Sequence, residues 1–118
     1  MDILRFLRAS KADRDWWLTE QCRQALADRD LSHLDEIFRH LAGHPFRSQV
    51  FRCVVRELSQ QIDDLESADQ FCRWLAGYLA DVPELVFRDL LMSERAMHVR
   101  LGDRAGYLRC LRQLDRSW

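Results

Sequence analysis

The sequence predicts an all-α protein built from about three stacked antiparallel helical hairpins, with six to seven helices in a single domain. Apolar residues recur at helical spacing along most of the chain. β-Branched residues, which crowd the preceding turn of a helix, are scarce: six Val, three Ile and one Thr among 118 residues. An internal repeat of paired helices then favours stacked hairpins over an irregular bundle.

The first hairpin is predicted from its boundary residues. Asp13 can cap a helix that runs to Leu26, and the polar segment 28–30 closes it. Ser32 opens a shorter helix that extends to Ala42, where Gly43 supplies the stop.

The later hairpins carry similar signals. Pro45 is interpreted as the first-turn proline of the next helix, and Ser67 with Gln70 as a capping box that opens its partner. Another boundary is expected at Asp81 and Pro83. The last two helices are expected to meet at Gly102 and Asp103, which stop one helix and cap the next.

Matched segments give the hairpins a period. Residues 37–43 (Ile-Phe-Arg-His-Leu-Ala-Gly) match residues 71–77 (Phe-Cys-Arg-Trp-Leu-Ala-Gly) at an offset of 34, and residues 107–111 form a weaker third copy. Residues 50–55 match residues 86–91 at an offset of 36. Two matched helices in the same order indicate one repeated two-helix unit.

A unit of two helices that repeats every 34 to 36 residues, with a proline after the second helix, resembles tetratricopeptide-like repeats. The segment 96–107 looks like the inter-helix turn of such a unit. The length of 118 residues fits one domain, 1–118. The resemblance covers roughly residues 14–116 and implies that stacked hairpins create the core. An N-terminal segment, residues 1–12, is expected to cap the stack with Leu4, Phe6 and Leu7. The three hairpins are expected at residues 14–43, 46–80 and 83–116.

Composition excludes several classes of protein. The net charge of −1 gives no basic field for nucleic acid. No apolar run approaches a membrane span, and segment 1–8 carries too many charges for a secretory signal. The four cysteines are scattered, so reduced thiols and a cytoplasmic location are expected. Arg supplies 17 of 18 basic residues, which favours a bacterial source with a GC-rich genome.

The sequence predicts no catalytic, cofactor or metal site. His40 and His44 have the spacing that places two imidazoles on one helix face, but Gly43 and Pro45 suggest that the helix ends between them. The cysteines lie in apolar stripes, where they behave as small hydrophobes. No glycine-rich phosphate loop or nucleophile elbow is present, so we expect no enzyme.

Protein binding is the function that remains. The adjacent Trp16 and Trp17 point about 100° apart on a helix, so both cannot be buried in one apolar stripe. The tryptophan outside the stripe either is an exposed anchor for a partner or is covered by the N-terminal segment. Arginines recur at helical spacing on the first helices of the hairpins, with acids between them, which argues against a phosphate-binding stripe. The candidate partner-binding residues are Trp16, Trp17, Arg52, Arg56, Arg88, Met92 and Arg95.

The sequence therefore predicts an adaptor or chaperone that sequesters a helical segment of a protein partner in a groove. By size and hairpin count the chain is similar to three-repeat chaperones of type III secretion needle subunits. That likeness implies a groove that grips an aggregation-prone helix. Two alternatives stay open: a regulator that blocks a transcription factor or signalling protein, and a homo-oligomeric structural protein such as a homodimer.

Overall fold

The computed structural model describes residues 2–79 and 84–116, and within them all regular structure is helical. The fold class predicted from the sequence is confirmed. The helices, in chain order, are α1 (Ile3–Arg8), α2 (Lys11–Ala27), α3 (Ser32–His40), α4 (Arg47–Gln61), α5 (Leu65–Leu79), α6 (Glu84–Leu101) and α7 (Arg104–Arg116).

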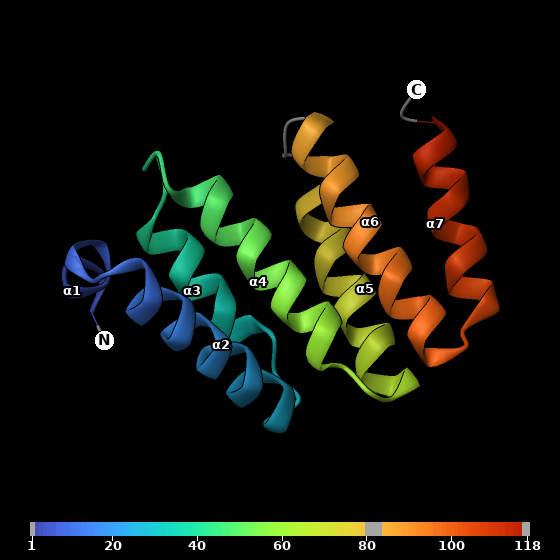
Figure 1. Ribbon diagram of the computed structural model, residues 1–118, viewed down its shortest axis with the longest axis horizontal. Helices are drawn as coiled ribbons and strands as arrows, with labels where there is room; N and C mark the ends of the chain where they lie inside the picture. Colours follow the sequence, from blue (N-terminus) through green and yellow to red (C-terminus); the bar gives the residue numbers. More distant parts are fainter. Residues whose placement is uncertain (1, 80–83, 117–118) are drawn as a thin grey trace.

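The helices α2 to α7 form three consecutive hairpins (Figure 1). The first helices of the hairpins, α2, α4 and α6, lie side by side in one layer, with α4 in contact with both neighbours. The returning helices α3 and α5 lie behind this layer, and α7 packs along α6 at the C-terminal end. Each hairpin therefore buries its apolar face against the next hairpin.

One hydrophobic cluster runs from α1 to α6, and the central helix α4 contributes more buried side chains to it than any other described helix. Val54, Val55 and Leu58 of α4 are fully buried, as are Leu34 of α3 and Leu75 of α5. Each buried side chain of this size contributes about 1.5–3 kcal/mol relative to an exposed one. The middle hairpin thus holds the two outer hairpins together.

An aromatic cluster joins the first hairpin to the second. Phe38 of α3 packs edge-on against Phe51 of α4, with ring centroids 5.0 Å apart. Trp74 and Tyr78 of α5 complete the cluster, and both donate hydrogen bonds to Oδ1 of Asp35, the Trp74 bond at 2.8 Å. Trp74 occupies the repeat position of His40, but only the tryptophan packs against the core.

The N-terminal helix α1 covers the outer side of the first hairpin. Phe6 is 1% exposed and its ring lies 5.3 Å from that of Trp17. Leu7 also packs against the core, whereas Leu4 is exposed. Trp16, on the neighbouring face of α2, is 68% exposed. Of the two tryptophans, Trp17 is the one that α1 covers.

Several helix ends agree with the sequence. Gly43 and Gly102 both adopt positive φ, at 75° and 70°, which glycine tolerates without a Cβ penalty. Asp103 caps α7, because its Oδ1 accepts from the backbone N–H of Gly106 at 3.1 Å.

Two predicted N-caps are wrong. The N-cap of α2 is Ser10, whose hydroxyl accepts from the N–H of Asp13, so Asp13 lies inside the first turn. The cap of α5 is Asp64, which accepts from both the N–H and the hydroxyl of Ser67. In both cases a capping residue three positions upstream satisfies an N–H of the first turn, which moves the start of the helix toward the N-terminus.

The connection between α3 and α4 also differs from the prediction. α3 ends at His40 and not at Ala42, because the N–H of Ala42 bonds back to Arg39 in a tighter turn. Pro45 lies in the turn before α4, which begins at Arg47. The boundary predicted at Asp81 and Pro83 lies outside the described residues.

Candidate functional site

A hollow opens on the layer of first helices, between α2 and α4. Its volume is about 300 Å³. Buried apolar side chains from α1, α2 and α4 form its floor: Phe6, Leu18 and Val50. Its rim carries one acid, Asp15, and four basic side chains: Lys11, Arg14, Arg52 and Arg56. We refer to it as the α2–α4 hollow.

The basic side chains of this rim differ in how they are paired. Lys11 and Arg52 form ion pairs with acids, Lys11 with Asp15 at 2.9 Å and Arg52 with Asp89 of α6 at 2.6 Å. The guanidinium of Arg14 lies 5.4 Å from the ring centroid of Phe46, in cation–π contact. Among the described residues, neither Arg14 nor Arg56 forms an ion pair, so the rim retains positive charge.

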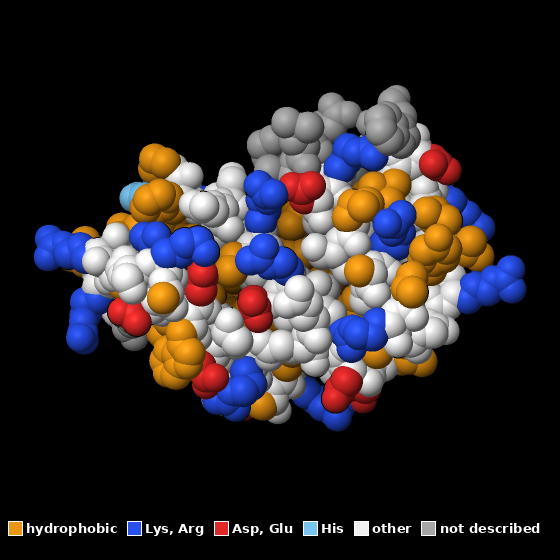
Figure 2. All heavy atoms as spheres, viewed as in Figure 1, with side chains coloured by type: hydrophobic (Ala, Val, Ile, Leu, Met, Phe, Trp, Pro, Cys, Tyr) orange, Lys and Arg blue, Asp and Glu red, His pale blue; other side chains and the backbone are white. Residues whose placement is uncertain are grey.

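A second hollow lies between α4 and α6, and Arg56 lines both hollows. Met92, which is 44% exposed, lines this second hollow with Arg100. Arg100 donates two hydrogen bonds of 2.6 Å to the carbonyls of Ser59 and Ile62, at the C-terminal end of α4. Figure 2, in which α2, α4 and α6 lie in front, shows basic side chains gathered over this face with acids between them.

The structure brings together some of the candidate partner-binding residues. Arg52 and Arg56 line the α2–α4 hollow, and Arg56 and Met92 line the hollow beside it. Trp16 is exposed on α2 but lines neither hollow, while Trp17 packs against Phe6. The remaining two candidates, Arg88 and Arg95, are half-buried on α6.

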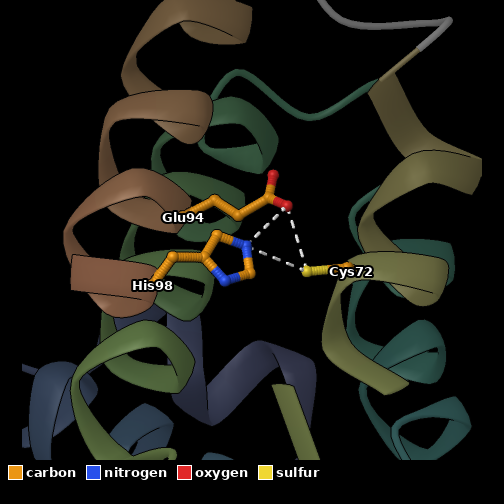
Figure 3. Close-up of side chains that lie close together, drawn as sticks. All are labelled: Cys72, Glu94 and His98. Atoms are coloured by element: carbon orange, nitrogen blue, oxygen red, sulfur yellow. Dashed lines mark hydrogen bonds and ion pairs between the residues drawn. The ribbon is translucent and has the colours of Figure 1, made fainter. Parts of the chain in front are cut away.

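A different group of polar side chains meets between α5 and α6 (Figure 3). Sγ of Cys72 lies 3.0 Å from Oε1 of Glu94 and 3.6 Å from Nε2 of His98. Nε2 of His98 lies 3.3 Å from the same Glu94 oxygen. Glu94 and His98 share one face of α6 because they are four residues apart. We call these three residues the Cys72 cluster.

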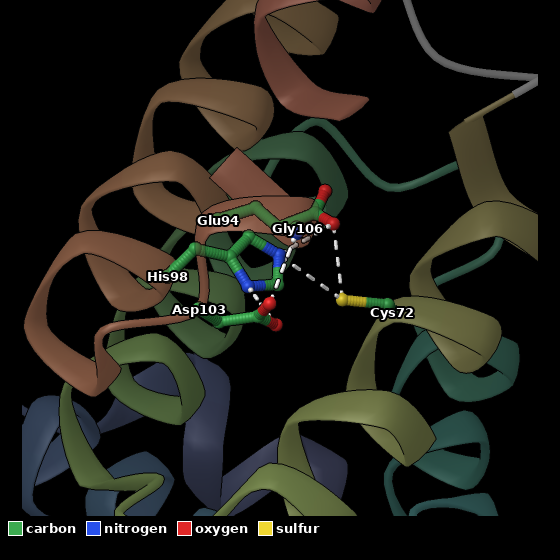
Figure 4. Close-up of polar contacts among 5 residues, drawn as sticks. All are labelled: Cys72, Glu94, His98, Asp103 and Gly106. Carbon is green, nitrogen blue, oxygen red and sulfur yellow. Dashed lines mark hydrogen bonds and ion pairs between the residues drawn. The ribbon is translucent and has the colours of Figure 1, made fainter. Parts of the chain in front are cut away.

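The imidazole of the Cys72 cluster is fixed from its other side (Figure 4). Oδ2 of Asp103 lies 3.1 Å from Nδ1 of His98, while Oδ1 of the same carboxylate caps α7. The backbone of Gly106 lies against the ring. Because a carboxylate accepts hydrogen bonds, a proton on Nδ1 would be donated to Asp103, and Nε2 faces Cys72 and Glu94.

The cluster is buried, although one side can be reached from solvent. His98 is 1% exposed and Glu94 8%, whereas Cys72 is half-buried. Burial and then the Glu94 carboxylate raise the pKa of the Cys72 thiol well above its ordinary value. The same two causes raise the pKa of the nearby Cys110 thiol to about 12. Both thiols are therefore protonated in the protein without a bound cation.

Sequence reasoning missed this cluster. His40 and His44, the pair with metal-ligand spacing, make other contacts: His40 bonds the carbonyl of Glu36 and His44 accepts from the N–H of Phe46. Cys72, treated as a small hydrophobe, instead donates to a carboxylate. The available signal was the Glu-x-x-x-His spacing of residues 94–98, which places a carboxylate and an imidazole on one helix face.

All four cysteines are free thiols. Among the described helices, none has both the length and the apolar character needed to cross a bilayer. Comparisons with protein-family models, curated proteins and solved structures found no match to this chain.

Proposed function

We propose that this protein is a non-enzymatic adaptor or chaperone that holds an acidic, amphipathic helical segment of a partner protein in the α2–α4 hollow. The observation that carries the proposal is the combination of an apolar floor with a basic rim on an open helical face. A cytoplasmic setting, in which thiols stay reduced, fits the four free cysteines.

The shape of the hollow favours a helix. Its walls are the neighbouring helices α2 and α4, and the apolar side chains of Leu18 and Val50, one from each helix, line the space between them. An amphipathic helix laid along such a groove inserts anchors spaced three or four residues apart. A volume of about 300 Å³ accommodates a few such side chains and leaves the rest of the partner helix outside.

The charge of the rim selects the kind of helix. Arg14 and Arg56 line the hollow without an ion-pair partner among the described residues. Acidic residues beside the apolar anchors of a partner would pair with them, whereas basic residues would be repelled. The partner segment is therefore expected to carry Asp or Glu next to large apolar side chains.

A regulator that sequesters a transcription factor would use the same hollow and differs from a chaperone only in the identity of its partner. A homo-oligomer would use it to hold a second copy of this chain. Phe46, an exposed apolar side chain that lines the hollow, would then contact the second copy.

Site-specific photo-crosslinking tests the proposal. A photoreactive amino acid replaces Gln49, which lines the hollow, and in a matched control it replaces Gln113, which is exposed on α7. Both variants are irradiated in cells of the native host. We expect one dominant adduct from position 49 and none of that mass from position 113.

Mass spectrometry of the adduct decides the outcome. The proposal is supported if the cross-linked peptide comes from another protein and has alternating acidic and apolar residues at helical spacing. A peptide from this chain itself would establish the homo-oligomer. The same adducts from positions 49 and 113 would contradict a specific groove.

A further inference from the structure

The Cys72 cluster has the arrangement of a metal site. Its three atoms are a thiol sulfur, an imidazole nitrogen and a carboxylate oxygen, and all lie within 4.8 Å of one another. They come from two packed helices, α5 and α6, and point toward a common centre (Figure 3). We propose that Cys72, Glu94 and His98 bind a zinc ion or a divalent transition-metal cation of similar softness.

The distances within the cluster fit a tetrahedral ion. With Zn–S bonds of about 2.3 Å and Zn–N and Zn–O bonds of about 2.0–2.2 Å, neighbouring ligand atoms are separated by about 3.3–3.6 Å. The separations involving Nε2 of His98 are 3.6 Å to Cys72 and 3.3 Å to Glu94. The third, from Cys72 to Glu94, is 3.0 Å and would widen by about 0.5 Å around an ion of this geometry.

The surroundings of His98 are those of a metal ligand. Imidazoles that bind metals usually donate their other N–H to a carboxylate, which fixes the tautomer and the ring orientation. Asp103 takes this position, with Oδ2 at 3.1 Å from Nδ1. Gly106 holds the ring from the side, so Nε2 is directed at Cys72 and Glu94 (Figure 4).

The hydrogen bonding shows what a cation would replace. With Nδ1 donating to Asp103, Nε2 can donate to Glu94 only if the ring carries a second proton. The same Glu94 oxygen already accepts from the Cys72 thiol. One divalent cation at the centre would take the place of the thiol hydrogen, and of the Nε2 hydrogen when the ring carries a second proton, and would bind the sulfur, nitrogen and oxygen atoms directly.

The donor set selects the metal. A thiolate and an imidazole favour zinc and its neighbours over Mg²⁺ and Ca²⁺, which prefer oxygen ligands. Three protein ligands leave a fourth tetrahedral position for water. The half-buried Cys72 provides the side from which the ion would enter.

Metal titration of the purified 118-residue chain tests the site. The protein is stripped with a chelator under reducing conditions and then loaded with Zn²⁺ or Co²⁺. We expect one zinc per chain to remain after desalting, a higher melting temperature, and a thiolate-to-cobalt charge-transfer band in the absorption spectrum.

Matched variants locate the ligands. Cys72→Ser and Glu94→Gln should each lower the zinc affinity at least about tenfold, and Cys72→Ser should remove the charge-transfer band. Cys53→Ser, at another half-buried thiol, should change neither the zinc affinity nor the charge-transfer band. Asp103→Asn keeps a good helix cap and should weaken zinc binding by about 10–100-fold.

Circular dichroism verifies that each variant is folded, and the cobalt spectrum of the wild-type chain gives a result that depends on no variant. The site is refuted if wild-type protein retains no zinc and its cobalt spectrum lacks a thiolate band. It is equally refuted if the band survives Cys72→Ser.

Discussion

The backbone of Gly106 lies so close to the imidazole of His98 that no Cβ fits between them. A methyl group at this position would lie well inside van der Waals contact with Nδ1 and Cε1 of His98, and 2.7 Å from Oδ2 of Asp103. The first turn of α7 thus packs directly on a buried side chain of α6. This contact fixes the third hairpin and the orientation of the His98 ring together.

Gly106→Ala should therefore destabilise the protein, although alanine is the better helix former. Overpacking of this kind lowers the free energy of unfolding by about 1–3 kcal/mol. The matched control is Gly77→Ala in α5, where an added Cβ meets open space. That change should raise the free energy of unfolding by about 0.5–1 kcal/mol. Urea denaturation followed by circular dichroism measures both, and equal effects would contradict the close packing at Gly106.

The docking of α1 on the first hairpin depends on Phe6. Phe6→Ala should lower the free energy of unfolding by about 3–5 kcal/mol, because it empties a buried site against Trp17. Leu4→Ala, in the same helix but exposed, should change it by less than about 0.5 kcal/mol. If both substitutions prove equally mild in thermal melts, α1 is not part of the folded core.

Tyr78 should ionise at unusually high pH. Burial, followed by its hydrogen bond to the Asp35 carboxylate, raises the pKa of the Tyr78 phenol above its ordinary value. The neutral phenol is thus favoured in the folded protein. The neutral phenol contributes fully to the free energy of unfolding below the unfolded-state pKa of about 10. This contribution is lost as the pH rises through the pKa of Tyr78 in the folded protein.

Phenolate absorbance in a Tyr107→Phe background reports Tyr78 alone, because the chain has two tyrosines. We expect a midpoint above about pH 10 that moves down in Asp35→Asn and stays above the unfolded value, since burial remains. An unchanged midpoint in Asp35→Asn would show that the carboxylate does not contribute to the shift.

The sequence was sufficient to predict the helical stack because the relevant signals are local. Gly102 and Asp103 mark their helix–helix corner through backbone conformation and capping, which depend on neighbouring residues alone. The caps at Asp13 and Ser67 were wrong because two polar residues three positions apart can both cap, and the choice between them depends on where the helix starts to pack.

The Cys72 cluster could not be predicted in the same way. Cys72 and His98 are 26 residues apart and belong to different hairpins, so their meeting depends on how α5 packs against α6. The basic rim has a similar origin, since Arg14 and Arg56 approach the same hollow from α2 and α4. Contacts between hairpins are set by tertiary packing, which helical periodicity does not encode.

We propose that the basic rim of the α2–α4 hollow binds an acidic helical segment. The most direct test measures the affinity of the cross-linked partner segment, made as a peptide, for Arg14→Glu/Arg56→Glu and for Arg73→Glu/Arg112→Glu. The second variant has the same net charge, with its changes on α5 and α7 away from the hollow. We expect the first variant to bind roughly tenfold more weakly or worse and the second to bind like wild type. Equal affinity of the two variants would contradict the account.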